Sequence, residues 1–358
     1  MIEKTRLIDT FCDLVRIDSE SGNEDAMAEE MTDRLVKLGF EVQTDAYGNL
    51  IAGEGGDEPF MLSGHLDTVV PGNGINPIID GDRIRSDGTT IGGGDNKAGL
   101  AIILETLTSL KEDDSDRIPV EVVISREEEP GLIGAHALDF SMIQSKQAVV
   151  FDREGPVNRI TLSSPTYIAF DFDITGRAAH AGIEPENGIS AIQIASDLIT
   201  LLPQGRLDDE TTFSVGTVQG GSTRNTVPES AKVTGEFRTM NMETLDNLLL
   251  DIENALTDVR VKYPEADIKS DVSPKFKTFR INEQDPCTMM IVKALETIGL
   301  TPDFQLSGGG SDANVFWEHG ISAVVCGMAD YNMHTLREYV VIPELVQAVE
   351  FCSELLRA

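Results

Sequence analysis

The chain has 358 residues, of which 41% are hydrophobic and 25% are charged, as in an ordinary packed globular protein. This length favours about two domains, and the composition excludes a disordered chain, a collagen-like fibre and a bare coiled coil. Asp and Glu number 61 against 28 Lys and Arg, so the formal net charge is −33. Such a surface repels phosphate backbones and anionic membranes, and we do not expect nucleic-acid binding.

The first predicted elements are a helix and a pair of short strands. Ser21 and Glu24 match a capping box, in which the two side chains satisfy each other's free backbone N–H groups. Apolar residues follow at helical spacing, and Gly39 is a natural helix stop. The two strands are residues 40–45 and 50–52, with a turn between them. The opening segment therefore predicts an α/β protein.

Four later segments read as buried strands, because they are near-continuous apolar runs. They are residues 59–63, 118–125, 148–151 and 321–326. Each is followed by side chains that can bind a metal: His65 and Asp67, Glu127–Glu129, Asp152, and His334. In open α/β sheets, ligands bind beyond the carboxyl ends of the strands. We therefore expect these side chains to gather at one edge of a sheet.

The middle third of the chain has a different pattern. Residues 168–174 alternate between apolar and polar, which predicts a strand with one wet face. A helix, two strands, a helix and a strand follow, at residues 190–202, 213–218, 231–238, 244–263 and 266–272. The order β-α-β-β-α-β is typical of a ferredoxin-like domain. We predict an inserted domain at 166–277, with 1–165 and 278–358 forming one α/β domain that ends in helices near 286–299 and 343–358.

Three polar motifs are candidates for chemistry. The spacing of His65 and Asp67 places both side chains on the same side of an extended segment. Asp67 could then orient a metal-bound His65, although such a pair also occurs in plain polar loops. The glycines before Asp95 allow close packing around that carboxylate, and no phosphate-binding G-x-x-x-x-G-K-[ST] motif is present. The run Glu127–Glu129 needs a cation or a retained proton, unless it is a solvated acidic loop.

The histidines and cysteines narrow the search. Among the five histidines, His180 lies in a loop of small residues that leaves room for a ligand, while His136 and His319 occur in helical contexts and are expected to be structural. The cysteines Cys12, Cys287, Cys326 and Cys352 form no CxxC pair. They are expected to be buried, reduced thiols.

The apolar runs are far shorter than the roughly 20 residues of a membrane span, and no signal core begins the chain. We therefore expect a cytoplasmic protein.

Five motifs occur in one order along the chain. They are SGHLDTV at 63–69, GGGDNKAG at 92–99, EEPG at 128–131, GRAAHAG at 176–182 and SGGGSD at 307–312. Together they resemble the M20 metallopeptidase family, and most of all its peptidase T (tripeptidase) branch. The resemblance spans nearly the whole chain. It implies a mixed-sheet, zinc-exopeptidase-like catalytic domain with an inserted lid or dimerisation domain, and a possible homodimer.

The resemblance also implies roles for individual residues. Asp95 would bridge two divalent metal ions, with His65 and Asp152 completing one site and Glu129 and His334 the other. Glu128 would be the general base, and Asp67 the partner of His65. The residues that would reach the substrate are His180, Asn225 and Arg238. Zinc is the first choice for this mixture of carboxylates and imidazoles, and cobalt or manganese could replace it.

Two positions depart from the family pattern. Glu127 stands where Asp is usual, and Asn96 stands where peptidase T relatives often carry a second Asp after the bridging one. In the family the peptide bond at that position, here Asp95–Asn96, is typically cis. These changes leave the predicted metal ligands intact and bear on substrate preference.

The predicted activity is that of a metal-dependent aminopeptidase acting on short peptides, with tripeptides as the first expectation. Glu128 would take a proton from a metal-activated water and return it to the leaving amine. An amidohydrolase of the same fold that cleaves N-acyl amino acids needs the same metal site, and the sequence separates the two poorly. A catalytically silent binding protein is a third alternative, although every expected ligand and the base are present.

Overall fold

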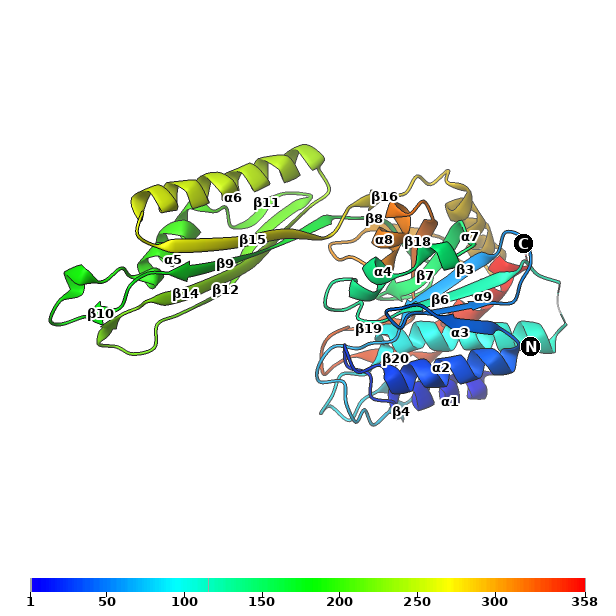
Figure 1. Cartoon of the computed structure of the whole chain (residues 1–358). Coiled ribbons are helices and arrows are strands. Elements are labelled where there is room, and N and C mark those ends of the chain that lie inside the picture. Colours follow the sequence, from blue (N-terminus) through cyan, green and yellow to red (C-terminus); the bar gives the residue numbers. More distant parts are fainter. Residues whose placement is uncertain (1, 115, 358) are drawn as a thin grey trace. The chain divides into compact units, whose positions relative to one another are not determined.

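The computed structural model of the chain describes residues 2–114 and 116–357. In this part of the chain there are two compact units, which appear in Figure 1. The main unit contains the described residues up to Ser163 and from Arg280 onward, and the inserted unit is Ser164–Phe279. No helix in the described ranges combines the length and the hydropathy that crossing a membrane requires.

The main unit is built on a nine-stranded sheet with the order β1-β2-β6-β3-β7-β18-β8-β16, and β17 pairs with β8. The strands are β1 (Glu41–Thr44), β2 (Leu50–Gly53), β3 (Phe60–His65), β6 (Val120–Ser125), β7 (Gln147–Arg153), β8 (Arg159–Ser164), β16 (Phe279–Arg280), β17 (Asp303–Leu306) and β18 (Ser322–Gly327). β3 is parallel to β6 and β7, and β7 is parallel to β18, whereas β2 and β8 are antiparallel to their neighbours in the centre. The predicted mixed sheet with buried parallel strands is confirmed.

Helices cover both faces of this sheet. They are α1 (Lys4–Val15), α2 (Asp25–Leu38), α3 (Gly94–Glu112), α4 (Ile133–Ala137), the 3-10 turn η1 (Phe140–Met142), α7 (Pro286–Thr297), α8 (Asp312–Glu318) and α9 (Ile342–Leu356). The connections β3–α3–β6 and β6–α4–β7 cross the sheet in opposite directions, and right-handed crossovers then place α3 and α4 on opposite faces. Figure 1 shows α1 and α2 beside α3, and α8 near α4.

A second, small sheet in the main unit escaped the sequence analysis. It has the order β19-β20-β5-β4, with strands β4 (Ile78–Asp80), β5 (Arg83–Arg85), β19 (Asp330–Tyr331) and β20 (Tyr339–Val341). β19 and β20 form a hairpin, and the loop between them carries His334. The small sheet therefore holds one of the predicted metal ligands.

The start of α2 differs from the prediction. Met27, Met31 and Leu35 are fully buried at helical spacing, and Gly39 ends the helix with φ 99°, as expected. However, Ser21 and Glu24 do not form a capping box. The Ser21 hydroxyl donates to Asp67, and Glu24 accepts hydrogen bonds from Gly22 N–H and from the Arg126 guanidinium. These two side chains therefore bind Asp67 and Arg126 and not the free N–H groups at the start of α2.

The inserted unit has a five-stranded antiparallel sheet with the order β11-β12-β14-β9-β15. Its elements are β9 (Thr166–Thr175), β10 (Ala179–His180), the 3-10 turn η2 (Pro185–Asn187), α5 (Ala191–Leu201), β11 (Gly205–Asp208), β12 (Thr211–Gly220), β13 (Thr226–Val227), β14 (Ser230–Thr239), α6 (Met242–Lys262) and β15 (Asp267–Phe276). Without the extra edge strand β11 and the separate two-stranded sheet β10–β13, this is the predicted β-α-β-β-α-β order with ferredoxin-like strand arrangement. The expected fold class is thus confirmed.

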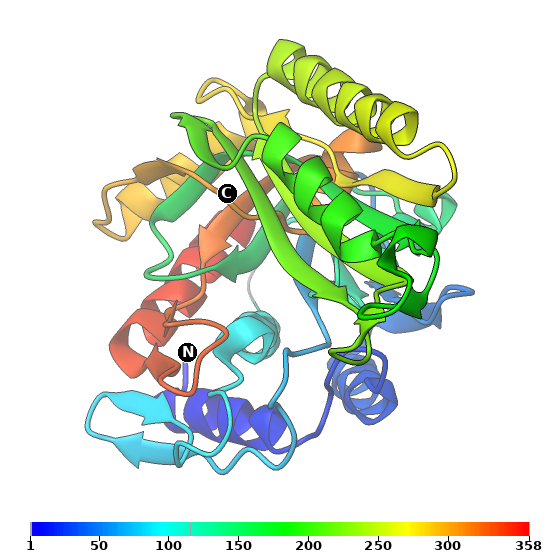
Figure 2. The same cartoon turned by 90° about the vertical axis from the view of Figure 1, so that its left-hand side faces the viewer.

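One apolar core holds the inserted unit together. Alternate residues of β9, among them Phe170 and Phe172, point to the same face as Phe213 and Phe237 of the neighbouring strands. Ile194 of α5 and other apolar side chains of α5 and α6 close over them, so both helices lie on one face of the sheet, as Figure 2 shows. The other face, which carries Asp171 and Lys232, is polar.

Candidate metal centre

The predicted metal ligands meet at one edge of the main sheet. His65 is the last residue of β3 and pairs in register with Ser125, the last residue of β6. Glu128 and Glu129 follow β6 at once, and Asp152 lies in β7, the other parallel neighbour of β3. Because parallel strands end at the same edge, these side chains gather there.

Asp95 lies at the centre of the group, at the start of α3. Its Oδ1 is 3.0 Å from His65 Nε2, and its Oδ2 is 3.1 Å from His334 Nε2. The Asp95–Asn96 peptide bond is cis, and the glycine loop before it, residues 92–94, is buried. A carboxylate whose two oxygens face two different imidazoles could bridge two cations.

Two further carboxylates complete the arrangement. Glu129 Oε2 lies 3.1 Å from His334 Nε2, and Asp152 Oδ1 lies 3.7 Å from His65 Nε2. Ligand atoms of His65, Asp95 and Glu129 all lie within 4.8 Å of one another. Asp95 is thus flanked by His65 with Asp152 on one side and by His334 with Glu129 on the other.

Asp67 fixes both His65 and the turn that follows β6. One of its oxygens is 3.2 Å from His65 Nδ1 and accepts the Glu128 N–H at 2.9 Å. The other accepts the Ser21 hydroxyl at 2.7 Å and the Glu129 N–H at 3.2 Å. Burial acts to raise the pKa of Asp67, but hydrogen bonds from His65 and Ser21 lower it, so the group stays ionised. The Asp67 carbonyl oxygen, 3.1 Å from His65 Nδ1, and the ionised carboxylate together keep the proton on Nδ1 and turn Nε2 toward Asp95.

The pKa values of the two histidines and of two carboxyl groups are shifted upward at this edge. Burial acts to lower the pKa of His65, yet the surrounding Asp152, Asp67 and Asp95 raise it well above its usual range. Hydrogen bonds with Asp95 and Glu129 raise the pKa of His334 to about 10. Burial raises the pKa of Glu129 to about 7 and that of Asp152 to about 6. In the absence of ions, protons on these groups balance the buried carboxylates.

These residues fit divalent cations. Glu129 Oε1 is buried and has no hydrogen-bond partner, although its carboxylate faces the other ligands. Both imidazoles direct Nε2 at carboxylate oxygens, and a cation between each pair would satisfy both groups without the extra protons. Carboxylates mixed with imidazoles are the ligands of zinc and of similar transition metals.

Glu128 precedes Glu129 in the turn after β6, and its side chain lies near those of Asp152 and His65. Its residue is 8% exposed, and its backbone N–H is held by Asp67. Burial, followed by the nearby Asp152 carboxylate, raises the pKa of Glu128 well above its usual range. Glu127 before it has φ 45° and accepts a hydrogen bond from the Tyr47 hydroxyl at 2.9 Å.

The three residues predicted to reach the substrate lie in the inserted unit, in two places. His180 and Asn225 are close together, because β10 pairs with β13 and the Ala181 N–H donates to the Asn225 carbonyl. Arg238 pairs with Tyr167 at the other end of β9 from Thr175, roughly 25 Å away at about 3.3 Å per residue. Its guanidinium covers the Tyr167 ring and contacts Glu236. The structure therefore brings His180 and Asn225 together and holds Arg238 apart from them.

Two buried carboxylates at the site were missed from the sequence. Glu338, at the end of the His334 loop, accepts hydrogen bonds from the backbone of residues 92–95. Asp330 lies beside it, and burial together with the Glu338 and Asp95 carboxylates raises the pKa of Asp330 well above its usual range. No motif or spacing relates these residues to the glycines, which are more than two hundred positions earlier in the chain. Only the folded chain brings them together.

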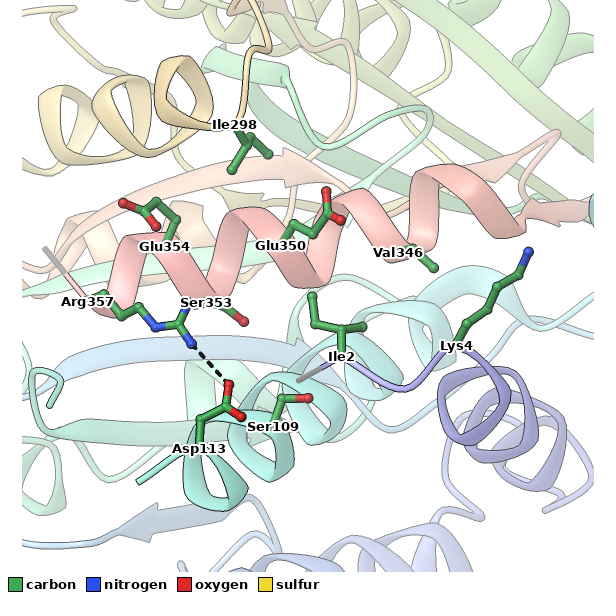
Figure 3. A pocket seen from close by; sticks show the side chains of 10 residues that line it. All are labelled: Ile2, Lys4, Ser109, Asp113, Ile298, Val346, Glu350, Ser353, Glu354 and Arg357. Carbon is green, nitrogen blue, oxygen red and sulfur yellow. Dashed lines mark hydrogen bonds and ion pairs between the residues drawn. The ribbon is translucent and has the colours of Figure 1, made fainter. Parts of the chain in front are cut away.

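A cavity of about 450 Å³ in the main unit lies away from this centre. Figure 3 shows its lining, which includes Ile2, Ser109, Asp113 and Glu350. Asp113 caps the end of α3 that is opposite Asp95, which places this part of the cavity roughly 25 Å from Asp95 at about 1.5 Å per residue. Its lining contains none of the predicted ligands.

Comparisons with known proteins show which families and structures the chain resembles. Residues 163–264 match the family model of a peptidase dimerisation domain, and residues 49–178 match peptidase family M28. The uncharacterized protein YqjE of Bacillus subtilis is 36% identical over 98% of this chain and 97% of its own length. The structure of aminopeptidase PepT from Bacillus cereus is 35% identical, with a TM-score of 0.88 over 99% of this chain and 98% of that one. A tripeptidase from Staphylococcus aureus is 30% identical, with a TM-score of 0.92 over 100% of this chain and 98% of that one.

Proposed function

The chain belongs to the M20 family of metallopeptidases and has a peptidase T-like structure, and from this premise we propose that it is a two-metal aminopeptidase of short peptides. The observation that carries the proposal is the central place of Asp95, with an imidazole nitrogen at each of its oxygens. Tripeptides are the proposed substrates, because the Staphylococcus aureus relative is a tripeptidase and the Bacillus cereus relative an aminopeptidase.

In this proposal, His65, Asp152 and Asp95 hold one ion, and His334, Glu129 and Asp95 hold the other. Two bound divalent ions, zinc in the first place and otherwise cobalt or manganese, supply activation of a water molecule and polarisation of the scissile carbonyl. Asp67 contributes by keeping His65 in the tautomer that presents Nε2.

Glu128 is the proposed general base and acid. Its carboxylate takes a proton from the attacking water and delivers that proton to the leaving amine nitrogen when the C–N bond breaks. Burial suits this role, because it raises the pKa of Glu128 well above its usual range and so makes this carboxylate a better proton acceptor. The Asp67 carboxylate supports Glu128 through the backbone N–H and so fixes where the base stands.

The inserted unit has two proposed roles. It is the surface through which the chain forms a homodimer, in line with its match to a peptidase dimerisation domain. It also carries the proposed substrate contacts His180, Asn225 and Arg238. His180 is exposed, and its Nδ1 accepts the Gly182 N–H, which leaves Nε2 available to donate to a substrate carbonyl oxygen.

The test is hydrolysis of a matched panel of dipeptides, tripeptides, tetrapeptides and N-acyl amino acids. The protein is first stripped with a chelator and then restored with zinc, cobalt or manganese. The proposal expects metal-dependent release of the N-terminal residue, with tripeptides cleaved fastest. Cleavage of N-acyl amino acids alone would retain the metal centre but reject the peptidase, and no cleavage by protein with two bound ions would reject the enzyme.

A further inference from the structure

Glu338 makes an unusual set of contacts for a buried carboxylate. The residue is 1% exposed, and its carboxylate faces the Asp330 side chain and three backbone N–H groups of one loop. Its Oε2 accepts from Gly92 at 2.7 Å and from Gly93 at 3.1 Å, and its Oε1 accepts from Asp95 at 3.1 Å. The loop that presents the bridging carboxylate is therefore bound to Glu338 at three points.

The glycines of this loop are required by the close approach. A Cβ on Gly92 would lie 2.9 Å from the Glu338 carbonyl oxygen, and a Cβ on Gly94 would collide with the Asp330 carboxylate. Asp330 and Glu338 stand at the base of the β19–β20 hairpin. The glycine-rich loop is thus pressed against that hairpin, and side chains larger than hydrogen would push the two apart.

The same hairpin carries a ligand of its own. His334 lies in the loop between β19 and β20 with φ 62°, and the Glu338 N–H donates to the Thr335 carbonyl at 3.1 Å. His334 contacts the side chain of Asp95, while Glu338 contacts its backbone. The hairpin therefore contacts Asp95 at both its side chain and its backbone. It connects His334 with Asp95, which are far apart in the sequence.

We propose that Glu338 is a positioning residue for the metal centre, which fixes the backbone of residues 92–95 so that the two oxygens of Asp95 face His65 and His334. This inference rests on the proposed function, because it takes Asp95 as the bridging ligand. A carboxylate suits the task since it offers two acceptor oxygens and no donor to oppose three N–H groups. Partners that orient ligands typically govern metal affinity by about 10- to 100-fold when they are replaced.

The variant Glu338→Gln tests the proposal. One of its two terminal atoms becomes an NH2 group, which must face backbone N–H groups of the loop and so displaces the Asp95 backbone. We expect the zinc dissociation constant, measured by competition with a chromophoric chelator, to rise by about 10- to 100-fold. The absorption spectrum of the cobalt-loaded variant should also change, because the angles at the bridging carboxylate change.

Glu121→Gln is the matched control. Glu121 is likewise a buried carboxylate of the main unit, 4% exposed, and accepts backbone N–H groups of Gln144 and Ser145. That loop carries no predicted ligand, so Glu121→Gln should lower stability while zinc affinity and the cobalt spectrum stay those of the unaltered protein.

Glu338→Asp is a second test variant, which retains the negative charge. Its shorter side chain cannot reach all three N–H groups, so we expect an intermediate loss of zinc affinity.

The outcomes are distinct. Weaker zinc binding and an altered cobalt spectrum in the Glu338 variants, with neither change in Glu121→Gln, support the positioning role. Unchanged zinc affinity in the Glu338 variants, or an equal loss in Glu121→Gln, overturns it while leaving the proposed function intact. Failure of the unaltered protein itself to bind two zinc ions would instead overturn the proposed function.

Discussion

The two units of this protein bury very different side chains. Within the described residues, every buried Asp, Glu, His and Lys belongs to the main unit. The core of the inserted unit consists of Phe, Ile, Leu, Val and Ala. Buried hydroxyls there include Thr211 and Thr239, which hydrogen-bond to each other at 3.0 Å. One unit thus has an ordinary apolar core, whereas the other gathers charge at one edge of its sheet.

The buried charges of the main unit lower its stability unless they are compensated. Buried carboxylates cost free energy unless cations or hydrogen bonds compensate them. In the main unit, hydrogen bonds compensate some of these carboxylates, such as Asp67 and Glu338. In Glu129, by contrast, one buried oxygen has no hydrogen-bond partner and could be compensated by a cation. Changes at the charged edge should therefore alter metal binding and activity, and changes in the apolar core should alter stability alone.

The largest expected effect is at Glu128, the proposed general base. Glu128→Gln removes the proton acceptor but keeps its size, so kcat should fall by about 10²- to 10⁴-fold, which is the range for general acid–base catalysis. Zinc content, measured by elemental analysis, should remain that of the unaltered protein. Glu127→Gln is the neighbouring control, because that carboxylate binds the Tyr47 hydroxyl and should tolerate the change. A Glu128→Gln variant with most of its activity would remove this residue from the mechanism.

The next effect concerns the apolar core of the inserted unit. Phe172 is fully buried and stacks on Phe170 with ring centroids 5.1 Å apart. Phe172→Ala should lower the free energy of unfolding of that unit by about 3–5 kcal/mol, because it leaves a cavity. Denaturant unfolding measures the loss, and zinc titration of the folded variant should give an unchanged dissociation constant. Weakened zinc binding would show that the metal centre of the main unit depends on the packing of the inserted unit.

Zinc should stabilise only the charged edge. At a free zinc concentration of about 100 times the dissociation constant, binding to the folded state adds about 2.7 kcal/mol. Hydrogen exchange should slow in the segments 63–67, 92–97 and 126–131, which hold the proposed ligands His65, Asp95 and Glu129 and also Asp67. Exchange in β9 and α5 of the inserted unit should not change. Equal slowing in both units would contradict the division between them.

The smallest effect is a pH dependence of stability in the metal-free protein. Burial raises the pKa of Glu129 to about 7 and that of Asp152 to about 6, so the folded state binds more protons than the unfolded chain between about pH 4 and pH 7. Stability therefore falls as pH rises through this window. The raised pKa of His334, about 10, continues the same trend at higher pH. Asp95, whose pKa is lowered, acts in the opposite direction only at more acid pH.

Zinc replaces these protons, so the difference in melting temperature between zinc-loaded and metal-free protein should grow from about pH 5 to about pH 7.5. Thermal unfolding of both forms in the same buffers measures it. A difference that stays constant over this range would mean that these carboxyl groups do not exchange protons for metal.

Much of the charged edge could be predicted because it follows from local pattern. Strands such as β3 and β6 are short apolar runs that end directly in His65 or in the glutamates, and parallel pairing then brings the ends together. The alternation in β9 likewise predicts the inserted sheet. In each case, the information lies within a few neighbouring residues.

What escaped prediction depends on contacts between distant segments. Ser21 and Glu24 match a local capping pattern, but Asp67 and Arg126 bind them instead. Glu338 holds the glycine loop from 243 positions away from Asp95, with no spacing to reveal it. The fold also separates Arg238 from His180 by the length of β9, which the order of the motifs does not show.

The most direct test of the central claim is anomalous diffraction from zinc-loaded crystals. The account predicts two peaks about 3.5–4 Å apart, one among His65, Asp152 and Asp95, the other among His334, Glu129 and Asp95. The same measurement on His334→Ala should show the first peak only. A single peak in the unaltered protein, or two peaks that do not share Asp95 as a ligand, would contradict the account.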